Sequence, residues 1–386
     1  MHLALVISVL RAATVVVGGG VHGSSAAYHL AKAGQDTILL EQFPLPHSRG
    51  SSHGQTRIIR LANYGVPQLT ALMADSFGMW RKIEQEAGVS LVRSSPMLVV
   101  TDDAKMMARV ERSVREGGDT PQRPRLSEVN RKYGSNLPAG NLTLIDPSAG
   151  VLMADKCVAT LQRLFREAGG RVVDEWPVER VEVGPGGAVE VRGPRGRVRA
   201  ERIVLCPGPW AGPLLAKMGV HLPLEVRRIS VFYWRIKDQA TPTVSFVHYG
   251  NEYHNYGLAQ LEYPGLMKLV QHTGPVISSP EQRDQRGASR EQRTKMQQYV
   301  REHWPTLHPE PVIEESCLYT MTPDEEFVID SHPSHPNVVF ACGFSGTGFK
   351  TAPAVGDNLC RLVLGRAPRH DLSAFRASRF APRSRM

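Results

Sequence analysis

Three glycines and one acidic residue near the N-terminus have the spacing of a phosphate-binding turn. Gly18, Gly20 and Gly23 follow the β-branched run at 14–17 and lead into a helical pattern, and Glu41 ends the next apolar run. Such glycines allow a tight turn, close approach of a pyrophosphate and close packing of helix on strand. The helix N-terminus would face the phosphates and Glu41 the ribose hydroxyls, so we predict a dinucleotide site. A carboxylate repels a 2′-phosphate, which disfavours NADP and leaves FAD and NAD open.

The five cysteines are dispersed, odd in number and include no C-x-x-C pair. This usage indicates a reducing compartment and argues against a disulfide framework or a zinc site, so no metal is predicted. A free cysteine is most often buried and inert, and composition alone assigns none of them a role. They are Cys157, Cys206, Cys317, Cys342 and Cys360.

The positive charge of the chain is concentrated at its C-terminus. Lys and Arg number 46 against 37 Asp and Glu, a formal net charge of +9, and six arginines against one aspartate lie in residues 365–386. The basic stretch 283–295 interleaves Asp284 and Glu291 and lacks aromatic residues on which bases could stack, so we expect no nucleic-acid partner. The apolar residues 1–10 are far short of the roughly 20 that a membrane helix needs. We expect them to form a short extension before the first strand, with no membrane partner.

The elements that must position these residues alternate between strands and helices. A length of 386 residues with 41% hydrophobic and 22% charged residues indicates an ordinary globular protein of two or three domains. The strand at 14–17, the helix at 24–33 and the strand at 37–41 predict a compact βαβ unit. Further helices are predicted at 67–88, 156–168, 291–303 and 355–364, strands at 97–100, 171–183, 198–205 and 338–342, and an antiparallel sheet across 227–270.

Three longer segments carry a family resemblance. They are residues 46–60 (PHSRGSSHGQTRIIR), residues 315–320 (ESCLYT) with 323–325 (PDE), and residues 343–350 (GFSGTGFK). Together with the N-terminal glycines they resemble the monomeric sarcosine oxidase family, most closely its peroxisomal sarcosine/L-pipecolate oxidase branch. The resemblance extends over nearly the whole chain, from about residue 15 to about residue 380.

This resemblance implies FAD rather than NAD. It also implies oxidation of a secondary amino acid, sarcosine, L-pipecolate or L-proline, to the imine, with O₂ reduced to H₂O₂. The imine from sarcosine would hydrolyse to glycine and formaldehyde. Two alternatives stay open, a flavin dehydrogenase that passes electrons to a carrier and a flavin-binding protein without catalysis. A monomer is expected, with the amino acid and O₂ as its small-molecule partners.

The resemblance also implies an α/β fold with two domains. A Rossmann-like FAD-binding domain is expected to be discontinuous, over residues 1–90, 145–220 and 320–386. A substrate domain built on an antiparallel sheet (α+β) is expected over residues 91–144 and 221–319. Its sheet would cover the flavin.

Four residues match family positions with direct chemical roles. Cys317 matches the cysteine that attaches the flavin, so a covalent 8α-S-cysteinyl FAD is implied. Arg60 and Lys350 match the pair that binds the substrate carboxylate, one as a bidentate fork and one as a point charge. Lys268 matches the lysine that activates O₂, where a fixed cation stabilises developing superoxide. Without the resemblance, an inert thiol and exposed surface cations would be favoured.

His272 and Tyr256 match residues at the family's substrate site, although a packed core position is equally compatible with each. His272 lies four residues after Lys268, which places both on one face of a strand. Thr347 stands where this branch usually has a histidine, and Ala259 where it has a proline. The cofactor-binding residues implied are Gly18, Gly20, Gly23, Glu41, His53, Thr56, Arg57, Cys317, Gly343, Gly346, Thr347 and Gly348.

The chain ends in Ser384-Arg385-Met386, which resembles the peroxisomal address Ser-Lys-Leu. We therefore expect a peroxisomal import receptor as a partner and the peroxisome as the location. The basic tail before the tripeptide is expected to be exposed.

Overall fold

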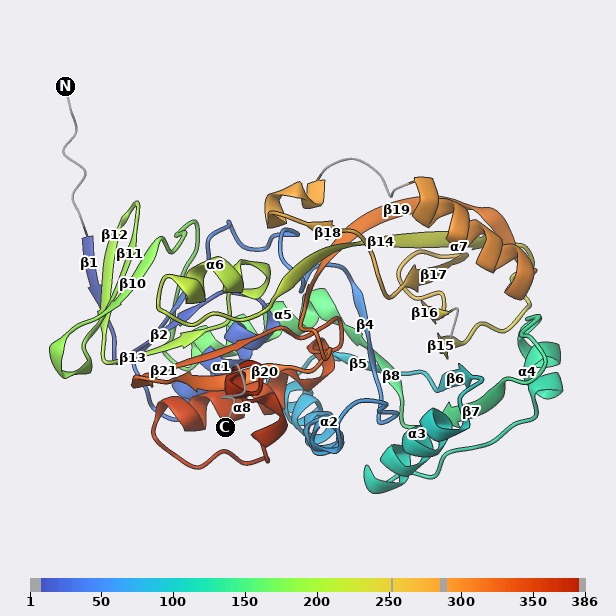
Figure 1. The fold of residues 1–386 in the computed structure, drawn as a ribbon, viewed down its shortest axis with the longest axis horizontal. Coiled ribbons are helices and arrows are strands. Elements are labelled where there is room, and N and C mark those ends of the chain that lie inside the picture. The colour runs from blue at the N-terminus through green and yellow to red at the C-terminus, as the bar shows by residue number, and fades with distance from the viewer. Residues whose placement is uncertain (1–7, 251–252, 285–289, 382–386) are drawn as a thin grey trace.

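The computed structural model describes residues 8–250, 253–284 and 290–381 (Figure 1). The strands β2, β13 and β21 lie in one part of the molecule with helices α1 and α8. Two long strands, β14 and β19, run from there to a second part that contains β15, β16 and β17 (Figure 1). The predicted α/β architecture with a second sheet is confirmed.

A six-stranded sheet carries the N-terminal glycine turn. Its order is β20-β21-β13-β2-β3-β9, and its pairs are parallel except for the edge pair β20 and β21. Every residue of β2 is buried, as expected of a parallel strand covered on both faces. The strands are β2 (Thr14–Val17), β3 (Thr37–Leu40), β9 (Arg171–Val173), β13 (Arg202–Leu205), β20 (Val328–His332) and β21 (His335–Cys342), and the helices beside them are α1 (Val21–Lys32), α5 (Ala154–Glu167) and α8 (Ala352–Val363).

An eight-stranded sheet forms the second part. Its path is β18-β14-β17-β16-β15-β6-β7, with β19 paired to β14. The pairs are antiparallel except for β6 with β15, which run parallel, so the sheet is mixed at that point. Its strands are β6 (Met97–Thr101), β7 (Leu142–Asp146), β14 (Glu225–Ile236), β15 (Ser245–Tyr249), β16 (His254–Leu258), β17 (Leu266–Gln271), β18 (Val276–Ile277) and β19 (Leu307–Met321).

Two smaller sheets correct two expectations. The predicted strand 198–205 is in fact two strands, β12 (Gly196–Ala200) and β13, which belong to different sheets because the chain changes sheet at Glu201. Part of the expected N-terminal extension is itself a strand: β1 (Ser8–Arg11) pairs in parallel with β12. Residues 1–7 lie outside the described chain. The small sheets are β1-β12-β11-β10, with β11 (Val189–Gly193) and β10 (Arg180–Val183), and β4-β8-β5, with β4 (Thr56–Ile59), β8 (Gly150–Met153) and β5 (Val92–Ser94).

The predicted helices are found close to their expected bounds. α2 begins at Pro67, a residue well suited to a first helical turn, and ends at Gly88, whose φ of 64° provides a left-handed cap. Over the described residues, no helix is long and apolar enough to cross a membrane. The remaining helices are α2 (Pro67–Ala87), α3 (Ala104–Glu116), α4 (Leu126–Tyr133), α6 (Ala211–Ala216) and α7 (Arg290–His303), with short 3₁₀ turns at Pro185–Gly187, Gly208–Trp210, Pro280–Asp284, Phe349–Thr351, Ser373–Phe375 and Ala377–Phe380.

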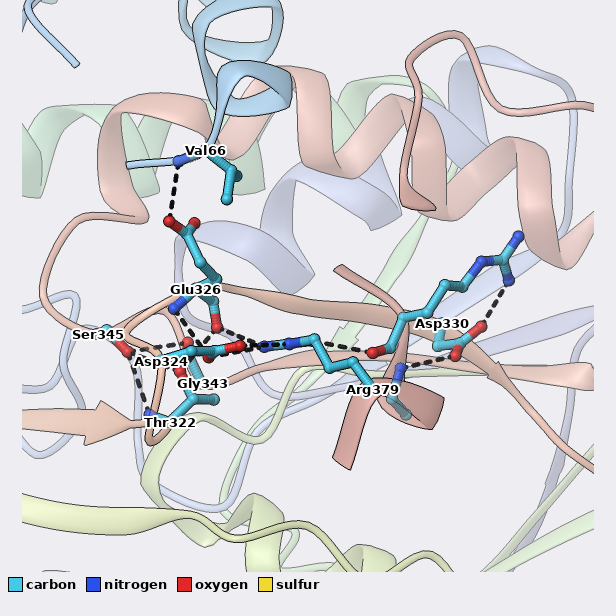
Figure 2. Close-up of polar contacts among 10 residues, drawn as sticks. Val66, Thr322, Asp324, Glu326, Asp330, Gly343, Ser345 and Arg379 are labelled. Atoms are coloured by element: carbon cyan, nitrogen blue, oxygen red, sulfur yellow. Dashed lines mark hydrogen bonds and ion pairs between the residues drawn. The ribbon is translucent and has the colours of Figure 1, made fainter. Parts of the chain in front are cut away.

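The C-terminal arginines are docked onto the fold. Arg379 donates from Nε to Asp324 at 2.7 Å and from its guanidinium to the Glu326 carbonyl at 2.9 Å. The Glu326 carboxylate in turn accepts from the Val66 amide at 3.0 Å, as Figure 2 shows. Arg376 pairs with Asp330 at 2.6 Å. Arg379 is thus half-buried, whereas Arg369 and Arg376 stay exposed while they pair with Asp357 and Asp330. Ser384-Arg385-Met386 lies outside the described chain.

Candidate active site

A cavity of about 310 Å³ opens at the carboxyl ends of β2 and β3. Open α/β sheets bind their ligands at this edge. The walls come from the N-terminal glycine turn, the segment after β13 and the turn after β21. Among the predicted cofactor residues, those that line it are Gly18, Gly20, Glu41, Arg57, Gly343, Gly346 and Gly348.

The glycine turn is sterically specified. A Cβ on Gly18, which has a φ of 102°, would lie 2.3 Å from the carbonyl oxygen of Cys206. A Cβ on Gly23 would lie 1.9 Å from the Gly18 carbonyl oxygen, so α1 can approach β2 this closely only with glycine there. Gly23 lines neither cavity, which agrees with a packing role. The first turn of α1 has no acidic residue, and its Val21 amide donates to Ser52 Oγ at 3.0 Å. The N-terminus of this helix would favour an anion.

Glu41 is buried at the end of β3 and lines the same cavity. Its carboxylate accepts hydrogen bonds from the amides of Gly19, at 2.7 Å, and Phe43, at 3.0 Å. These two bonds fix the orientation of the carboxylate. The cavity, the glycine turn and the placed acid together fit an FAD molecule.

A second cavity of about 90 Å³ continues inward and shares Arg57, Tyr319, Gly346 and Phe349 with the first. It brings together side chains from segments that are far apart in sequence. The predicted residues that line it are His53, Thr56, Arg57, Arg60, Tyr256, Lys268, His272, Cys317, Gly346, Thr347 and Lys350.

Arg60 and Lys350 are two buried cations in this inner cavity, with side chains 6% and 5% exposed. Arg60 donates to the Ala62 carbonyl and lies 4.5 Å from the Tyr64 ring, and Lys350 donates to the Thr347 carbonyl at 2.5 Å. Burial and the charge of Arg60 hold the pKa of Lys350 well below its usual value. Among the described residues neither cation forms an ion pair. Two uncompensated buried cations create a strong demand for an anionic ligand.

His272 and Tyr256 lie beside the two cations. Burial lowers the pKa of His272 to about 4 and raises that of Tyr256 to about 12, so both are neutral at physiological pH. The Tyr256 hydroxyl lies 3.1 Å from that of Tyr319. Gly346, with a φ of 74°, makes room for this group, since a Cβ there would lie 2.4 Å from the Tyr319 ring and 2.6 Å from His272.

Lys268 enters the inner cavity from β17 and is also buried. Its Nζ lies 2.7 Å from Oε1 of Glu262 and 3.5 Å from the hydroxyl of Thr56, which itself donates to Glu262. Burial lowers the pKa of Lys268, and Glu262 opposes this only in part. Arg57 completes the positive side of the cavity and is held by the carbonyls of Thr56 and His53, at 2.7 and 2.6 Å.

Cys317 lies on β19 between Glu315 and Tyr319, and all three line the inner cavity. Alternate residues of a strand share a face, which explains their grouping. The Cys317 thiol is close to the Ser51 carbonyl, with Sγ 4.0 Å from the oxygen. Cys317 lines the inner cavity, and its neighbour Ser51 lines the outer one. A bond between Cys317 and flavin stays a prediction.

Several cavity residues were missed by sequence reasoning. His22 lies inside the glycine turn and stacks on Phe344 with ring centroids 3.6 Å apart. The His254 ring lies 4.1 Å from that of His272, centroid to centroid, in a tilted arrangement. Alternation along β16 could have found His254, two residues before Tyr256. Glu262 carries no local signal, because it lies in an irregular loop before β17.

Comparisons with known proteins agree with this geometry. Residues 13–362 match the family described as FAD dependent oxidoreductase. The chain is 40% identical over 382 residues to peroxisomal sarcosine oxidase of Mus musculus, covering 96% of this chain and 97% of that protein. It is 31% identical over 373 residues to monomeric sarcosine oxidase of Bacillus sp. (strain B-0618), covering 95% of each.

Solved structures share the fold at lower sequence identity. NikD, an unusual amino acid oxidase essential for nikkomycin biosynthesis, superposes with a TM-score of 0.84 at 22% identity and covers 95% of this chain and 97% of its own. L-proline dehydrogenase from P. horikoshii superposes with a TM-score of 0.81 at 18% identity, covering 97% and 98%. On the family match and the sequence relatives, the chain belongs to the sarcosine oxidase family of FAD-dependent oxidoreductases and is a flavin-dependent oxidase.

Proposed function

We propose that this enzyme oxidises secondary amino acids, with sarcosine, L-pipecolate and L-proline as candidates, to the imine and reduces O₂ to H₂O₂. The observation that carries the proposal is the pair of buried cations, Arg60 and Lys350, without an ion-pair partner among the described residues. A substrate carboxylate would satisfy both, since a guanidinium binds it through two hydrogen bonds and an ammonium adds charge.

The surrounding side chains orient the amine. With the carboxylate on Arg60 and Lys350, the amine and its adjacent C–H bond face the junction with the outer cavity. His272 stays neutral because burial lowers its pKa to about 4, so it adds no third positive charge to repel an ammonium substrate. Bound FAD supplies the two-electron acceptor at this junction. The reactive form of the substrate is the neutral amine, so activity should rise with pH into the alkaline range.

Lys268 is proposed to assist the reaction with O₂. The first electron transferred to O₂ creates a negative charge, and a fixed cation in a buried site stabilises that charge strongly. Lys268 has the required burial, and Glu262 holds its ammonium group in place at 2.7 Å. Replacement by Met should slow oxidation of the reduced enzyme by O₂ and leave anaerobic reduction intact.

Cys317 is proposed to attach FAD covalently through the flavin 8α-carbon. The thiol and the 8α-methyl group each lose one hydrogen as the C–S bond forms, and O₂ accepts both as H₂O₂. Its place in the inner cavity beside Ser51, which lines the outer cavity, supports this assignment. Acid precipitation should leave the pellet yellow, and Cys317→Ser should release the flavin into the supernatant.

We further propose that the enzyme is a monomer that acts in the peroxisome, where an import receptor binds the terminal Ser384-Arg385-Met386. The relatives named peroxisomal sarcosine oxidase and monomeric sarcosine oxidase support both points. A producer of H₂O₂ also benefits from confinement in a compartment that removes it.

A substrate panel tests the activity directly. The purified holoenzyme is mixed with sarcosine, L-pipecolate or L-proline, and flavin bleaching without oxygen and peroxide formation with oxygen are both measured. Bleaching and peroxide with at least one of them are expected. If none bleaches the flavin, the proposed substrate class is wrong, whereas bleaching without peroxide would identify a dehydrogenase.

A further inference from the structure

A chain of hydrogen bonds extends from Lys268 to Tyr263 and passes Glu315, which also lines the inner cavity. Glu262 accepts from Lys268 on Oε1 at 2.7 Å, and its Oε2 lies 2.5 Å from the hydroxyl of Tyr233. The same hydroxyl lies 3.1 Å from Oε2 of Glu315, and Oε1 of Glu315 lies 3.2 Å from the hydroxyl of Tyr263. Five side chains are thus joined without a break.

The strands determine this arrangement. Tyr233 of β14 is directly opposite Lys268 of β17 in the antiparallel register, and β19 pairs with the other edge of β14. The ammonium of Lys268 also lies 5.4 Å from the Tyr233 ring centroid. Lys268, Glu262 and Tyr233 are buried, whereas Tyr263 is partly exposed and lies beyond the lining of the inner cavity. The chain therefore leads from the buried ammonium toward solvent.

The hydrogen-bond geometry around Tyr233 requires one proton more than this group of side chains would hold if Glu262 and Glu315 were both ionised. Tyr233 has a single hydroxyl proton but faces two carboxyl groups, and an ionised carboxylate can only accept. If both carboxyl groups were ionised, the oxygen of one of them would face the lone pairs of the Tyr233 hydroxyl. Such a contact without a proton between the two oxygens is costly in a buried site. A proton on one carboxyl removes this conflict.

Glu262 is the ionised member. Burial acts to raise its pKa, but the charge of Lys268 and hydrogen bonds from Lys268, Thr56 and Tyr233 lower the pKa below its usual value. The other charged or titratable groups near Lys268 are Arg57, His53 and Glu315, and of the two carboxyls it is Glu262 that bonds the ammonium directly, at 2.7 Å. The extra proton accordingly belongs on Glu315. The protonated carboxyl of Glu315 donates to the Tyr233 hydroxyl, and this hydroxyl donates to Glu262.

The reaction with O₂ needs such a proton. Reduction of O₂ to H₂O₂ takes two electrons and two protons, and a hydride equivalent from the reduced enzyme provides both electrons and one proton. The second proton has to come from the protein or solvent. Lys268 is the cation in the cavity that can donate it, and it must then be reprotonated.

We propose that Glu262, Tyr233, Glu315 and Tyr263 form a proton path that recharges Lys268 from solvent, with one proton stored at Glu315. In each cycle Lys268 gives a proton to the reduced oxygen. Tyr233 passes its proton to Glu262, which passes it on to Lys268, and Tyr233 takes the proton stored at Glu315. Solvent beside Tyr263 then replaces the proton at Glu315. The proposal rests on the oxygen-activating role of Lys268.

Infrared spectroscopy of the resting holoenzyme tests the stored proton without any turnover. A carbonyl band of a protonated carboxylic acid is expected at neutral pH. It should shift in D₂O and be absent in Glu315→Gln. Since no substrate is added, this result is independent of the proposed amino-acid oxidation.

Stopped-flow reoxidation tests the path. The flavin is reduced with dithionite and mixed with O₂, so the amino-acid substrate is again not involved. Tyr233→Phe should slow reoxidation on the order of 100-fold at alkaline pH, the usual size of a proton-transfer contribution, and should increase the solvent isotope effect. Glu315→Gln serves as the second variant if Tyr233→Phe does not fold.

Tyr28→Phe is a matched control, because it removes a tyrosine hydroxyl that bonds Glu86 at 2.6 Å away from both cavities. It should reoxidise like the unmodified enzyme. Absence of the infrared band, or equal reoxidation rates for Tyr233→Phe and Tyr28→Phe, would overturn the proposal. An unchanged reoxidation rate in Lys268→Met would instead show that Lys268 does not activate O₂.

Discussion

Individual side chains in the inner cavity carry charges that folding alone does not favour. Arg60 and Lys350 are buried, and burial together with Arg60 keeps the pKa of Lys350 low. Burying like charges costs stability unless a ligand compensates them. Such a site therefore gives up folding stability in order to bind an anion.

Removing one of the two cations should weaken carboxylate binding with little change in the free energy of unfolding. Lys350→Met should weaken binding of a non-oxidisable carboxylate such as propionate by about 2 kcal/mol, roughly 30-fold in Kd. The free energy of unfolding should not fall by more than about 1 kcal/mol, because a repulsion is removed together with one hydrogen bond. Flavin absorbance titration and urea unfolding measure the two effects.

The matched control is Lys82→Met, which removes an exposed lysine of α2. It should leave the Kd unchanged. Equal carboxylate affinity for Lys350→Met and the unmodified enzyme would contradict the assigned binding pair.

The buried histidines make stability depend on pH. Burial lowers the pKa of His248 and of His272 to about 4. Between pH 6.5 and 4 the unfolded chain binds protons at these sites and the folded chain does not, so stability falls as the pH falls. The slope is about 1.4 kcal/mol per pH unit for each such histidine.

His248→Gln should remove one histidine's share of this slope, measured as the free energy of unfolding in urea at a series of pH values. The site is suitable because His248 lies outside both cavities and bonds Tyr299 at 3.0 Å. His308→Gln, at an exposed position, controls for the substitution. An unchanged slope for His248→Gln would show that this imidazole becomes protonated in the folded state.

Much of the site could be predicted at the residue scale. The predictions came from the family resemblance of whole segments and not from the chemistry of single residues. Arg60 and Lys350 are 290 positions apart, and only the segments around them indicated a pair. Glu262 was not predicted, since a carboxylate in an irregular loop has no periodicity. Its partner Tyr233 reaches it only through strand register, which a sequence does not display.

At the scale of elements, the turn after β21 determines the shape of the inner cavity. Gly346 places the backbone against the rings of Tyr319 and His272. The adjacent short turn Phe349–Thr351 then directs Lys350 inward. This turn is rigid because Ser345 bonds both Thr322 and the Gly343 carbonyl (Figure 2).

Gly346→Ala should therefore disturb the site beyond backbone strain. Strain at its φ of 74° costs on the order of 1 kcal/mol, and displacement of two buried rings adds about 1–3 kcal/mol. Gly34→Ala is the control, because Gly34 has a φ of 75° and nothing within 4 Å of an added Cβ.

The two variants are compared by thermal unfolding and by KM. Gly346→Ala should show the larger loss of stability and a raised KM, and Gly34→Ala a small loss with KM unchanged. Equal effects in both would mean that the contact with Tyr319 and His272 has no functional importance.

Elements with clear periodicity were predictable, and those decided by pairing were not. The βαβ unit and α2 agree with the expected positions because apolar spacing and terminal Gly or Pro residues define them locally. The division of 198–205 into β12 and β13 depends on which sheet each half joins. The parallel pair of β6 and β15 likewise joins segments almost 150 residues apart. The domain boundaries stay predictions.

For the whole molecule, the charge excess turns out to be distributed among specific partners. Arg369, Arg376 and Arg379 pair with Asp357, Asp330 and Asp324. Much of the basic tail thus fastens the chain end to β20 and α8 instead of forming an open cationic surface.

Deletion of Ser384-Arg385-Met386 should consequently relocate the enzyme without inactivating it. Within the described part of the tail, Arg379 makes the last side-chain anchoring contact, so the purified deletion variant should retain its peroxide production. In cells, a fluorescently tagged protein should change from peroxisomal spots to a diffuse cytosolic signal. Replacement by Ser-Lys-Leu should restore the spots, and unchanged spots after deletion would refute the targeting role.

The length of β19 has a consequence for how such a sequence can change over time. Glu315, Cys317 and Tyr319 reach the cavity because they share odd positions on one uninterrupted strand. The register shifts in the pairing with β14 all lie before Ile313, and the pairing is regular from Ile313 to Met321. A single-residue insertion within 315–319 would therefore move part of this group to the opposite face of the strand. The chemistry of the site therefore depends on the spacing of these residues along the strand as well as on their identity.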